Sequence, residues 1–243
     1  MHKIVTWVLL VIGSLLLQCC TILDDHRWPV GHKKIILSFD DGPNPEISDA
    51  LLDVLKKHNV KATFCFVGRN AEKYPQQVYR AVEEGHLLAL HAFSRSYPAV
   101  WQYDTMLQEV ELSKQAINEA EFPDGIKLEY YRPPRGLITP TVKKLRAETD
   151  IKIAYLSFYI HDAPLGPADI DGLFEKYTRK ITALQGAAIV IHEARFKSDP
   201  EKDNKIDKSW VPAFVDKLVL WGKTQGYQFV QYSDAPLRDQ VIN

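Results

Sequence analysis

The stretch KKIILSFDDGP, residues 33–43, places two adjacent carboxylates directly after an apolar run. Residues 33–39 predict a buried β-strand, and Gly42-Pro43 predicts a turn after it. Adjacent carboxylates repel each other, so burying Asp40 and Asp41 together requires a cation or a shared proton. A metal ion would supply that cation and let one aspartate bind the ion while the other acts as a base. The alternative is an ordinary Asp-Gly-Pro turn with both acids in solvent.

Six further apolar runs alternate with amphipathic stretches along the chain. Strands that alternate with helices indicate parallel β/α units, so the predicted fold class is α/β. Seven such strands can close, or nearly close, into a barrel. Gly226 predicts the end of the last helix. The predicted strands cover residues 33–39, 62–67, 87–90, 128–131, 153–158, 187–191 and 227–231.

Acids, bases and cationic side chains follow several of the other strands. In a parallel barrel the carboxyl ends of the strands meet at one mouth, where active sites are built. We therefore expect these side chains to converge with Asp40 on one pocket. They are His91 after the third strand, Arg132 after the fourth, Asp162 just past the fifth and His192 at the end of the sixth.

Each of these side chains suits a part of metal-assisted hydrolysis. A neutral imidazole at His91 can bind a metal, or it can be a hydrogen-bonded histidine at the edge of the core. Arg132, followed by two prolines, can clamp a carboxylate and keep it ionised, or it can lie in solvent at the strand end. His192 can act as a general acid near neutral pH, and Asp162 can hold its ring and raise its pKa.

The order and spacing of these motifs resemble the polysaccharide deacetylase family, carbohydrate esterase family 4, with its NodB-like homology domain. The resemblance covers roughly residues 33–232 and rests on SFDDGP, on Gly85-His86 running to His91, on YRPPRG, on Asp162 and on IVIH. It implies a hydrolase of non-peptide carbon–nitrogen bonds that removes N-acetyl groups from a polysaccharide. Peptidoglycan or a polymer of N-acetylglucosamine would be the substrate. The implied fold is a distorted (β/α) barrel.

The resemblance also implies a role for each matched residue. Asp40 would take a proton from water, held in place by Arg132, and His192 would be the acid, paired with Asp162. Asp41 and His91 would bind a divalent metal, which is usually zinc in this family. The backbone amide of Arg135, next to Pro134, would help to hold the oxyanion. The implied sets are catalytic Asp40, His192, Arg132 and Asp162, substrate or oxyanion Arg135 and Pro134, and metal Asp41 and His91.

Four positions depart from the family pattern. Arg95 stands where the family has a second metal-binding histidine, and a guanidinium has no lone pair to offer a metal. Leu90 replaces a small polar residue, Arg135 an aromatic residue, and Ala163 a tryptophan that lines the acetyl pocket. One alternative is therefore a degenerate homologue that binds glycan with little or no activity. Another is a glycoside hydrolase with two carboxylates, which leaves the histidine and the Asp40-Asp41 pair without a role.

The first 23 residues predict a secretory signal peptide or a membrane anchor. His2 and Lys3 precede an uncharged run over residues 4–23, which is long enough to span a bilayer. Cys19 and Cys20 would suit a lipoprotein leader, although Gln18 fits that cleavage site poorly. Residues 24–32 would then be a tether and residues 33–243 the catalytic domain. This organisation predicts an extracytoplasmic location, in the periplasm, on the cell envelope or secreted.

Composition narrows the classes of partner. A net charge of −1 offers no basic field for nucleic acid, and 243 residues of which 46% are hydrophobic suffice for one domain with a large core. Two of the three cysteines lie in the predicted leader, which argues against a disulfide framework. The polar residues 197–208 predict an exposed loop. The expected partners are an N-acetylated glycan and, through the leader, a membrane.

Overall fold

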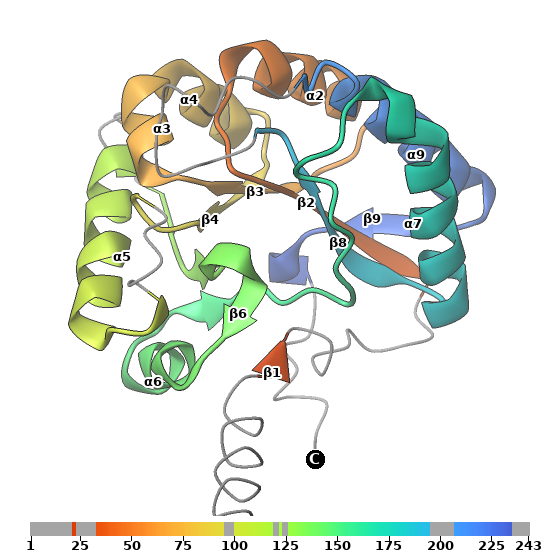
Figure 1. The fold of residues 1–243 in the computed structure, drawn as a ribbon. Helices are drawn as coiled ribbons and strands as arrows, with labels where there is room; N and C mark the ends of the chain where they lie inside the picture. Colours follow the sequence, from red (N-terminus) through yellow and green to blue (C-terminus); the bar gives the residue numbers. More distant parts are fainter. Residues whose placement is uncertain are drawn as a thin grey trace, which may run out of the picture.

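The computed structural model describes residues 21–22, 33–94, 100–118, 122, 126–194 and 207–234. Within these residues the main sheet has the strand order β7-β5-β4-β3-β2-β8, with β9 also beside β2, and every pairing is parallel. Figure 1 shows the helices arranged around the outside of this curled sheet. The strands are β2 (Lys34–Asp40), β3 (Thr63–Phe66), β4 (Leu87–Leu90), β5 (Tyr130–Tyr131), β7 (Lys152–Ile153), β8 (Ala187–His192) and β9 (Gln228–Val230).

The helices between these strands begin and end at recognisable signals. Four of them have proline in the first turn, where the missing N–H costs nothing. Gly226 follows the last helix with φ 76°, which confirms the predicted helix end. The helices are α2 (Pro45–Lys57), α3 (Gly68–Lys73), α4 (Pro75–Glu83), α5 (Tyr103–Asn118), α6 (Pro140–Glu148), α7 (Ile170–Leu184) and α9 (Val211–Thr224), with 3-10 turns η3 (Pro134–Gly136), η4 (Pro167–Asp169) and η5 (Tyr232–Asp234).

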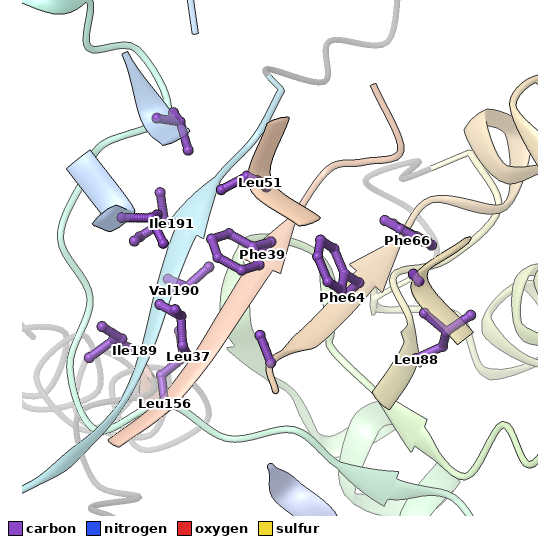
Figure 2. Close-up of a cluster of buried hydrophobic side chains, with 14 of the residues drawn as sticks. Leu37, Phe39, Leu51, Phe64, Phe66, Leu88, Leu156, Ile189, Val190 and Ile191 are labelled. Atoms are coloured by element: carbon purple, nitrogen blue, oxygen red, sulfur yellow. The ribbon is translucent and has the colours of Figure 1, made fainter. Parts of the chain in front are cut away.

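The two faces of β2 have different chemistry because successive side chains of a strand point to opposite faces. Leu37 and Phe39 pack into the large cluster between sheet and helices, where the Phe39 and Phe64 ring centroids are 5.1 Å apart (Figure 2). Ile36 belongs to a second cluster of mostly small residues on the inner face. Ser38 and Asp40 alternate with Leu37 and Phe39 and so share the inner face with Ile36. Because most of its apolar side chains are small, the inner face leaves space for polar side chains at the carboxyl end of the sheet.

The predicted α/β barrel-type fold is confirmed, and one strand prediction is wrong. The predicted strand 153–158 ends at Ile153, and the chain beyond it runs irregularly beside β8. The Ser157 N–H donates to the Ala188 carbonyl over 2.9 Å, and the Ala188 N–H donates to Ser157 Oγ over 2.8 Å. Because the hydroxyl takes the place of a backbone acceptor, no regular ladder forms. The sheet is therefore a curled half-barrel.

The sequence pattern missed a second, very short sheet. β1 (Thr21–Ile22), inside the predicted leader, pairs antiparallel with β6 (Leu137–Ile138). The remainder of the predicted leader and tether lies outside the described residues, as does most of the predicted loop 197–208. None of the helices in the described part of the chain is both long and apolar enough to cross a membrane.

Candidate active site

The predicted site residues meet at the carboxyl edge of the sheet. Asp40 and His192 are register partners on β2 and β8, and the pairing of Leu90 with Tyr131 sets His91 and Arg132 side by side. The structure thus brings together side chains that span about 150 residues of sequence, as the strand pattern predicts. All of the predicted acids and bases are at most 5% exposed, namely Asp40, Asp41, His91, Arg132, Asp162 and His192.

Arg132 clamps Asp40 with one end of its guanidinium. Its Nη1 lies 3.1 Å from Asp40 Oδ1 and 3.2 Å from Oδ2. Its Nη2 donates to Ser38 Oγ over 3.1 Å and to the Tyr232 hydroxyl over 3.0 Å, while Nε donates to the Ala154 carbonyl over 2.6 Å. Because the guanidinium is fixed on every side, it holds the carboxylate in one orientation.

The charges around Asp40 keep this carboxyl ionised. Burial alone would raise its pKa, but the positive charge of Arg132, with smaller effects of His91 and His192, outweighs burial. The net effect lowers the pKa of Asp40 below its ordinary value of 3.8, against an opposing effect of Asp41. Asp40 is thus a buried carboxylate that is ready to accept a proton.

His91 presents a lone pair to the aspartates. Its Nδ1 lies 2.8 Å from the Arg132 carbonyl, which can only accept, so Nδ1 carries the proton. In the neutral ring Nε2 is then unprotonated, and it lies 3.3 Å from Asp41 Oδ1 and 3.7 Å from Asp40 Oδ2. This buried Nε2 has no hydrogen-bond partner among the described residues. Backbone carbonyls commonly fix a metal-binding histidine in this way.

The separation of these two atoms suits a metal ion. Two ligand atoms that each lie about 2.0–2.1 Å from a tetrahedral ion are about 3.3 Å apart, as are His91 Nε2 and Asp41 Oδ1. Catalytic zinc normally keeps three protein ligands. In the described ranges no group of three or more His, Cys, Asp or Glu residues could hold a metal. Arg95, at the third family position, lies outside those ranges. Among the described residues the metal site therefore has one protein ligand fewer than catalytic zinc normally has.

Asp162 holds both the ring and the backbone of His192. Asp162 Oδ1 lies 2.7 Å from His192 Nδ1, and Oδ2 accepts the His192 N–H over 2.7 Å. Burial would lower the pKa of His192, but the charge and hydrogen bond of Asp162, aided by Asp41 and Asp40, raise it above 6.5 overall. Asp162 therefore favours the protonated form of the His192 ring. The ring of Tyr159 lies edge-on to His192 at 6.4 Å.

The YRPPRG segment leaves the same edge of the sheet just after β5. Pro134 is buried in η3, whereas the Arg135 side chain is exposed. Arg135 has φ 59° and ψ 11°, the left-handed conformation that non-glycine residues seldom adopt. The Gly136 N–H donates to the Pro133 carbonyl over 2.8 Å, which closes the turn. The role of the Arg135 amide at an oxyanion stays a prediction.

Four residues that the sequence interpretation did not assign complete the surroundings of the site. Ser38 could have been found, because it lies two positions before Asp40 and shares its face of the strand. Lys208 was expected in an exposed loop, but it is buried and its Nζ donates to the Asp162 carbonyl over 2.9 Å. In this buried position the Asp162 carbonyl accepts a hydrogen bond from the ammonium that water would accept at the surface. Tyr232 lies about 100 residues from Arg132 and no local pattern marks it. The fourth, Glu193, follows His192 and is fully buried.

The mouth thus combines a carboxyl group of lowered pKa with an imidazole of raised pKa. An acceptor and a donor of protons on neighbouring strands are the pair that general acid–base catalysis requires. Together the fold and the site define a curled (β/α) protein with a buried acid–base site. Comparison of the chain with models of known protein families identifies its family. The chain matches the family model for polysaccharide deacetylase over residues 28–154, more than half of its length, and it belongs to that family.

Curated relatives and solved structures agree with this assignment. A peptidoglycan-N-acetylglucosamine deacetylase of Bacillus cereus is 35% identical over 129 residues, 53% of this chain and 46% of that protein. The chain spans less than half the length of the first curated relatives it matches. A crystal structure of the Bc1960 peptidoglycan N-acetylglucosamine deacetylase, in complex with 4-naphthalen-1-yl-N-oxidanyl-benzamide, is 27% identical, with a TM-score of 0.66 over 86% of this chain and 90% of that one.

A further neighbour shares the fold alone. The CE4 family pseudoenzyme of Bacillus anthracis is 20% identical and has a TM-score of 0.64 over 84% of this chain and 65% of its own. The family therefore includes a protein of this fold described as a pseudoenzyme.

Proposed function

We propose that the chain is a metal-dependent hydrolase that removes N-acetyl groups from an extracytoplasmic polysaccharide, either peptidoglycan or another polymer of N-acetylglucosamine. One observation carries the proposal. The clamped carboxylate of Asp40 and the charged ring of His192 are register partners on neighbouring strands. Family membership supports the type of bond, because several curated relatives are named as peptidoglycan-N-acetylglucosamine deacetylases or chitin deacetylases.

The proposed reaction uses these two groups in sequence. Asp40 accepts a proton from the water that attacks the acetyl carbonyl, and a carbon–oxygen bond forms. His192 then donates its proton to the amide nitrogen as the carbon–nitrogen bond breaks, which releases acetate and a free amine on the sugar. Arg132 keeps Asp40 ionised and oriented, while Asp162 does the same for the charged form of His192. A divalent metal held by Asp41 and His91 would polarise the acetyl carbonyl as a Lewis acid.

Acetate release tests the reaction. A chito-oligosaccharide should yield acetate and free amines, and no new reducing ends. Reducing ends without acetate would indicate a glycoside hydrolase instead. The variant Asp40→Asn serves as the control for catalysis, because asparagine can still accept a hydrogen bond from Arg132 but cannot take a proton. We expect turnover to fall by at least about a hundredfold. Metal content, measured by atomic absorption, should stay unchanged. Loss of metal with activity would mean that Asp40 is a ligand.

The alternative is a glycan-binding homologue with little activity, and Arg95 motivates it. Because arginine cannot bind a metal, we expect weak metal binding by the wild type and activity that chelators remove and excess metal restores. Arg95→His should tighten zinc binding in calorimetry and raise the rate, with Arg95→Gln as a matched variant that removes the charge without adding a ligand. If Arg95→His gains neither zinc nor activity, the binding function becomes the better proposal.

The proposed location rests on the first 23 residues of the sequence. Fractionation of cells that express the full chain should recover the protein outside the cytoplasm, in the membrane, periplasm or medium. Labelled fatty acid that is incorporated by the wild type, and lost when Cys19 and Cys20 are both changed to serine, would identify a lipoprotein. A cytoplasmic protein that retains Met1 would contradict the proposed location.

A further inference from the structure

Glu193 is a buried acid to which the proposed reaction gives no role. It follows His192, is 0% exposed, and its own N–H donates to the Asp40 carbonyl over 3.2 Å. Its Oε2 accepts a hydrogen bond from Ser48 Oγ over 2.7 Å, while Oε1 has no hydrogen-bond partner within the described part of the chain. Burying a carboxyl group that makes so few hydrogen bonds costs free energy, so its presence in the fold calls for a structural or functional explanation.

The free end of Glu193 fills the space above Gly42. A Cβ atom built at residue 42 would lie 1.5 Å from Glu193 Oε1 and 2.4 Å from Cδ. Only glycine therefore fits at position 42 while Glu193 keeps its place. The Gly42 carbonyl in turn accepts the Val67 N–H over 2.8 Å. Glu193 thus packs directly on the turn that follows the two aspartates.

That turn has a backbone conformation that its surroundings must maintain. Asp41 has φ 76°, in the left-handed region that is unfavourable for a residue with a side chain. Asn70 Nδ2 donates to the Asp41 carbonyl over 3.0 Å and holds the turn from α3. Glu193 holds it from the end of β8. Together these two contacts restrain the backbone that sets the direction of the Asp41 side chain.

Ser48 connects Glu193 to the helix that begins after the turn. Its Oγ donates to Glu193 and accepts the Asn44 N–H over 2.9 Å, and the whole residue is buried in the first turns of α2. Burial, with Asp41 and Asp40 acting in the same direction, raises the pKa of Glu193 to about 8 against the opposing hydrogen bond of Ser48. The uncharged acid suits this apolar packing on Gly42.

We propose that Glu193 is a positioning residue, which fixes the turn bearing Asp40 and Asp41 relative to His192 by packing on Gly42 and bonding to Ser48. Its effect on rates rests on the proposed deacetylase function, whereas its effect on the turn does not. Because the base and the acid sit on separate strands, a small movement of the turn would change their alignment and slow the chemical step more than substrate binding.

Two substitutions at Glu193 distinguish the effect of its side-chain volume from the effect of its titratable group. Glu193→Gln keeps the volume and the acceptor for Ser48, so kcat should stay within about threefold of the wild type. Glu193→Ala leaves Gly42 uncovered, so kcat should fall by at least about tenfold while KM changes by less than about threefold. Leu145→Ala, a core variant on α6, controls for general destabilisation and should keep kcat when assayed below its melting temperature. Equal kcat in Glu193→Ala and the wild type would overturn the proposal.

A second readout does not depend on activity. The Val67 amide, bonded to the Gly42 carbonyl, should exchange its hydrogen faster in Glu193→Ala and at the wild-type rate in Glu193→Gln, as measured by NMR. If the wild type releases no acetate but Val67 shows this pattern, the proposed function fails and the positioning role stands. Unchanged exchange in Glu193→Ala would overturn the positioning role even in an active enzyme.

A double-mutant cycle covers the case in which Glu193→Ala folds poorly. Gly42→Ala should destabilise the wild type, because the new methyl group collides with the buried Glu193 side chain and forces it to move. The same change should cost much less in the Glu193→Ala background, where that space is empty. If Gly42→Ala lowers the unfolding midpoint equally in both backgrounds, Glu193 does not pack on the turn and the proposal is wrong.

Discussion

At the level of single residues, the surroundings of two titratable groups in the site shift their pKa values in opposite directions. At Asp40 the positive charge of Arg132, aided by His91 and His192, outweighs burial and lowers the pKa of that carboxyl. At His192 the charge and hydrogen bond of Asp162, aided by the two site aspartates, outweigh burial and raise the pKa of that ring. The surroundings thus favour the ionised form of the base and the protonated form of the acid. Catalytic groups commonly have pKa values pushed apart in this way. The rate should fall at high pH when His192 loses its proton.

Asp162→Asn tests this assignment through the pH dependence of the rate. The substitution removes the charge that raises the pKa of His192, so the pKa should fall and the basic limb should move to lower pH. A shift of about one unit or more is expected, since one unit corresponds to about 1.4 kcal/mol of lost interaction. The measurement is kcat/KM against pH for chito-oligosaccharide. Asp150→Asn, an exposed position, is the control and should leave the profile unchanged.

A basic limb that stays in place in Asp162→Asn would show that another group sets it. His192→Ala distinguishes the cases, because it should remove the limb altogether if His192 is the acid. Substrate binding should change little, since the proton is needed mainly in the transition state.

At the level of secondary-structure elements, sequence patterns predicted the strands and strand ends that depend on interactions between residues close in the sequence. Strand β2 follows from its apolar run, and His91 and His192 follow from the ends of β4 and β8. The irregular segment after Ile153 could not be predicted, because its partner is a serine hydroxyl rather than a neighbouring backbone. Glu193 was also missed, because its purpose depends on the space above Gly42, which no sequence pattern records.

The connection from α7 to β8 contains a second glycine that packs closely on a neighbouring segment, and this packing can be tested. Gly186 has φ 140°, and a Cβ there would lie 2.6 Å from the Lys34 carbonyl oxygen of β2. Gly186→Ala should therefore lower the free energy of unfolding by about 2 kcal/mol or more, from strain and from the clash with backbone. Urea denaturation measures the change.

Gly172→Ala provides the matched control for that experiment. Gly172 lies inside α7 with open space around it, so alanine should stabilise the helix by about 0.5–1 kcal/mol. Equal effects at the two glycines would mean that β8 is not packed against β2 as closely as the structure has it. Because β8 carries His192, a displaced strand should also lower the rate in Gly186→Ala.

At the scale of the whole molecule, buried charges make the stability of the fold depend on pH. Asp40 has a lowered pKa, so its stabilising effect is present above 3.8 and is lost as pH falls through the folded value. His192 has a raised pKa, so its contribution is present below 6.5 and is lost as pH rises through its folded value. Glu193 also has a raised pKa, so its contribution likewise decreases as pH rises, between 4.5 and about 8. The fold should be most stable in mildly acidic solution.

Glu193→Gln should flatten this dependence. The pKa of Glu193 rises from 4.5 to about 8 on folding, so between these values the folded chain keeps a proton that the unfolded chain has released. The wild type must therefore lose stability across that window as pH rises, by an amount on the order of a few kcal/mol. Glutamine has no proton to release, so the stability of the variant relative to the wild type should increase from pH 4.5 to 8.

Urea unfolding at several pH values across that window measures the difference directly. Glu175→Gln removes an exposed carboxylate from α7 and should follow the wild-type curve. Parallel curves for Glu193→Gln and the wild type would mean that the side chain reaches water in the folded protein, which would contradict its complete burial. A rising difference would instead show that the turn behind the two aspartates is held by an acid the fold keeps uncharged.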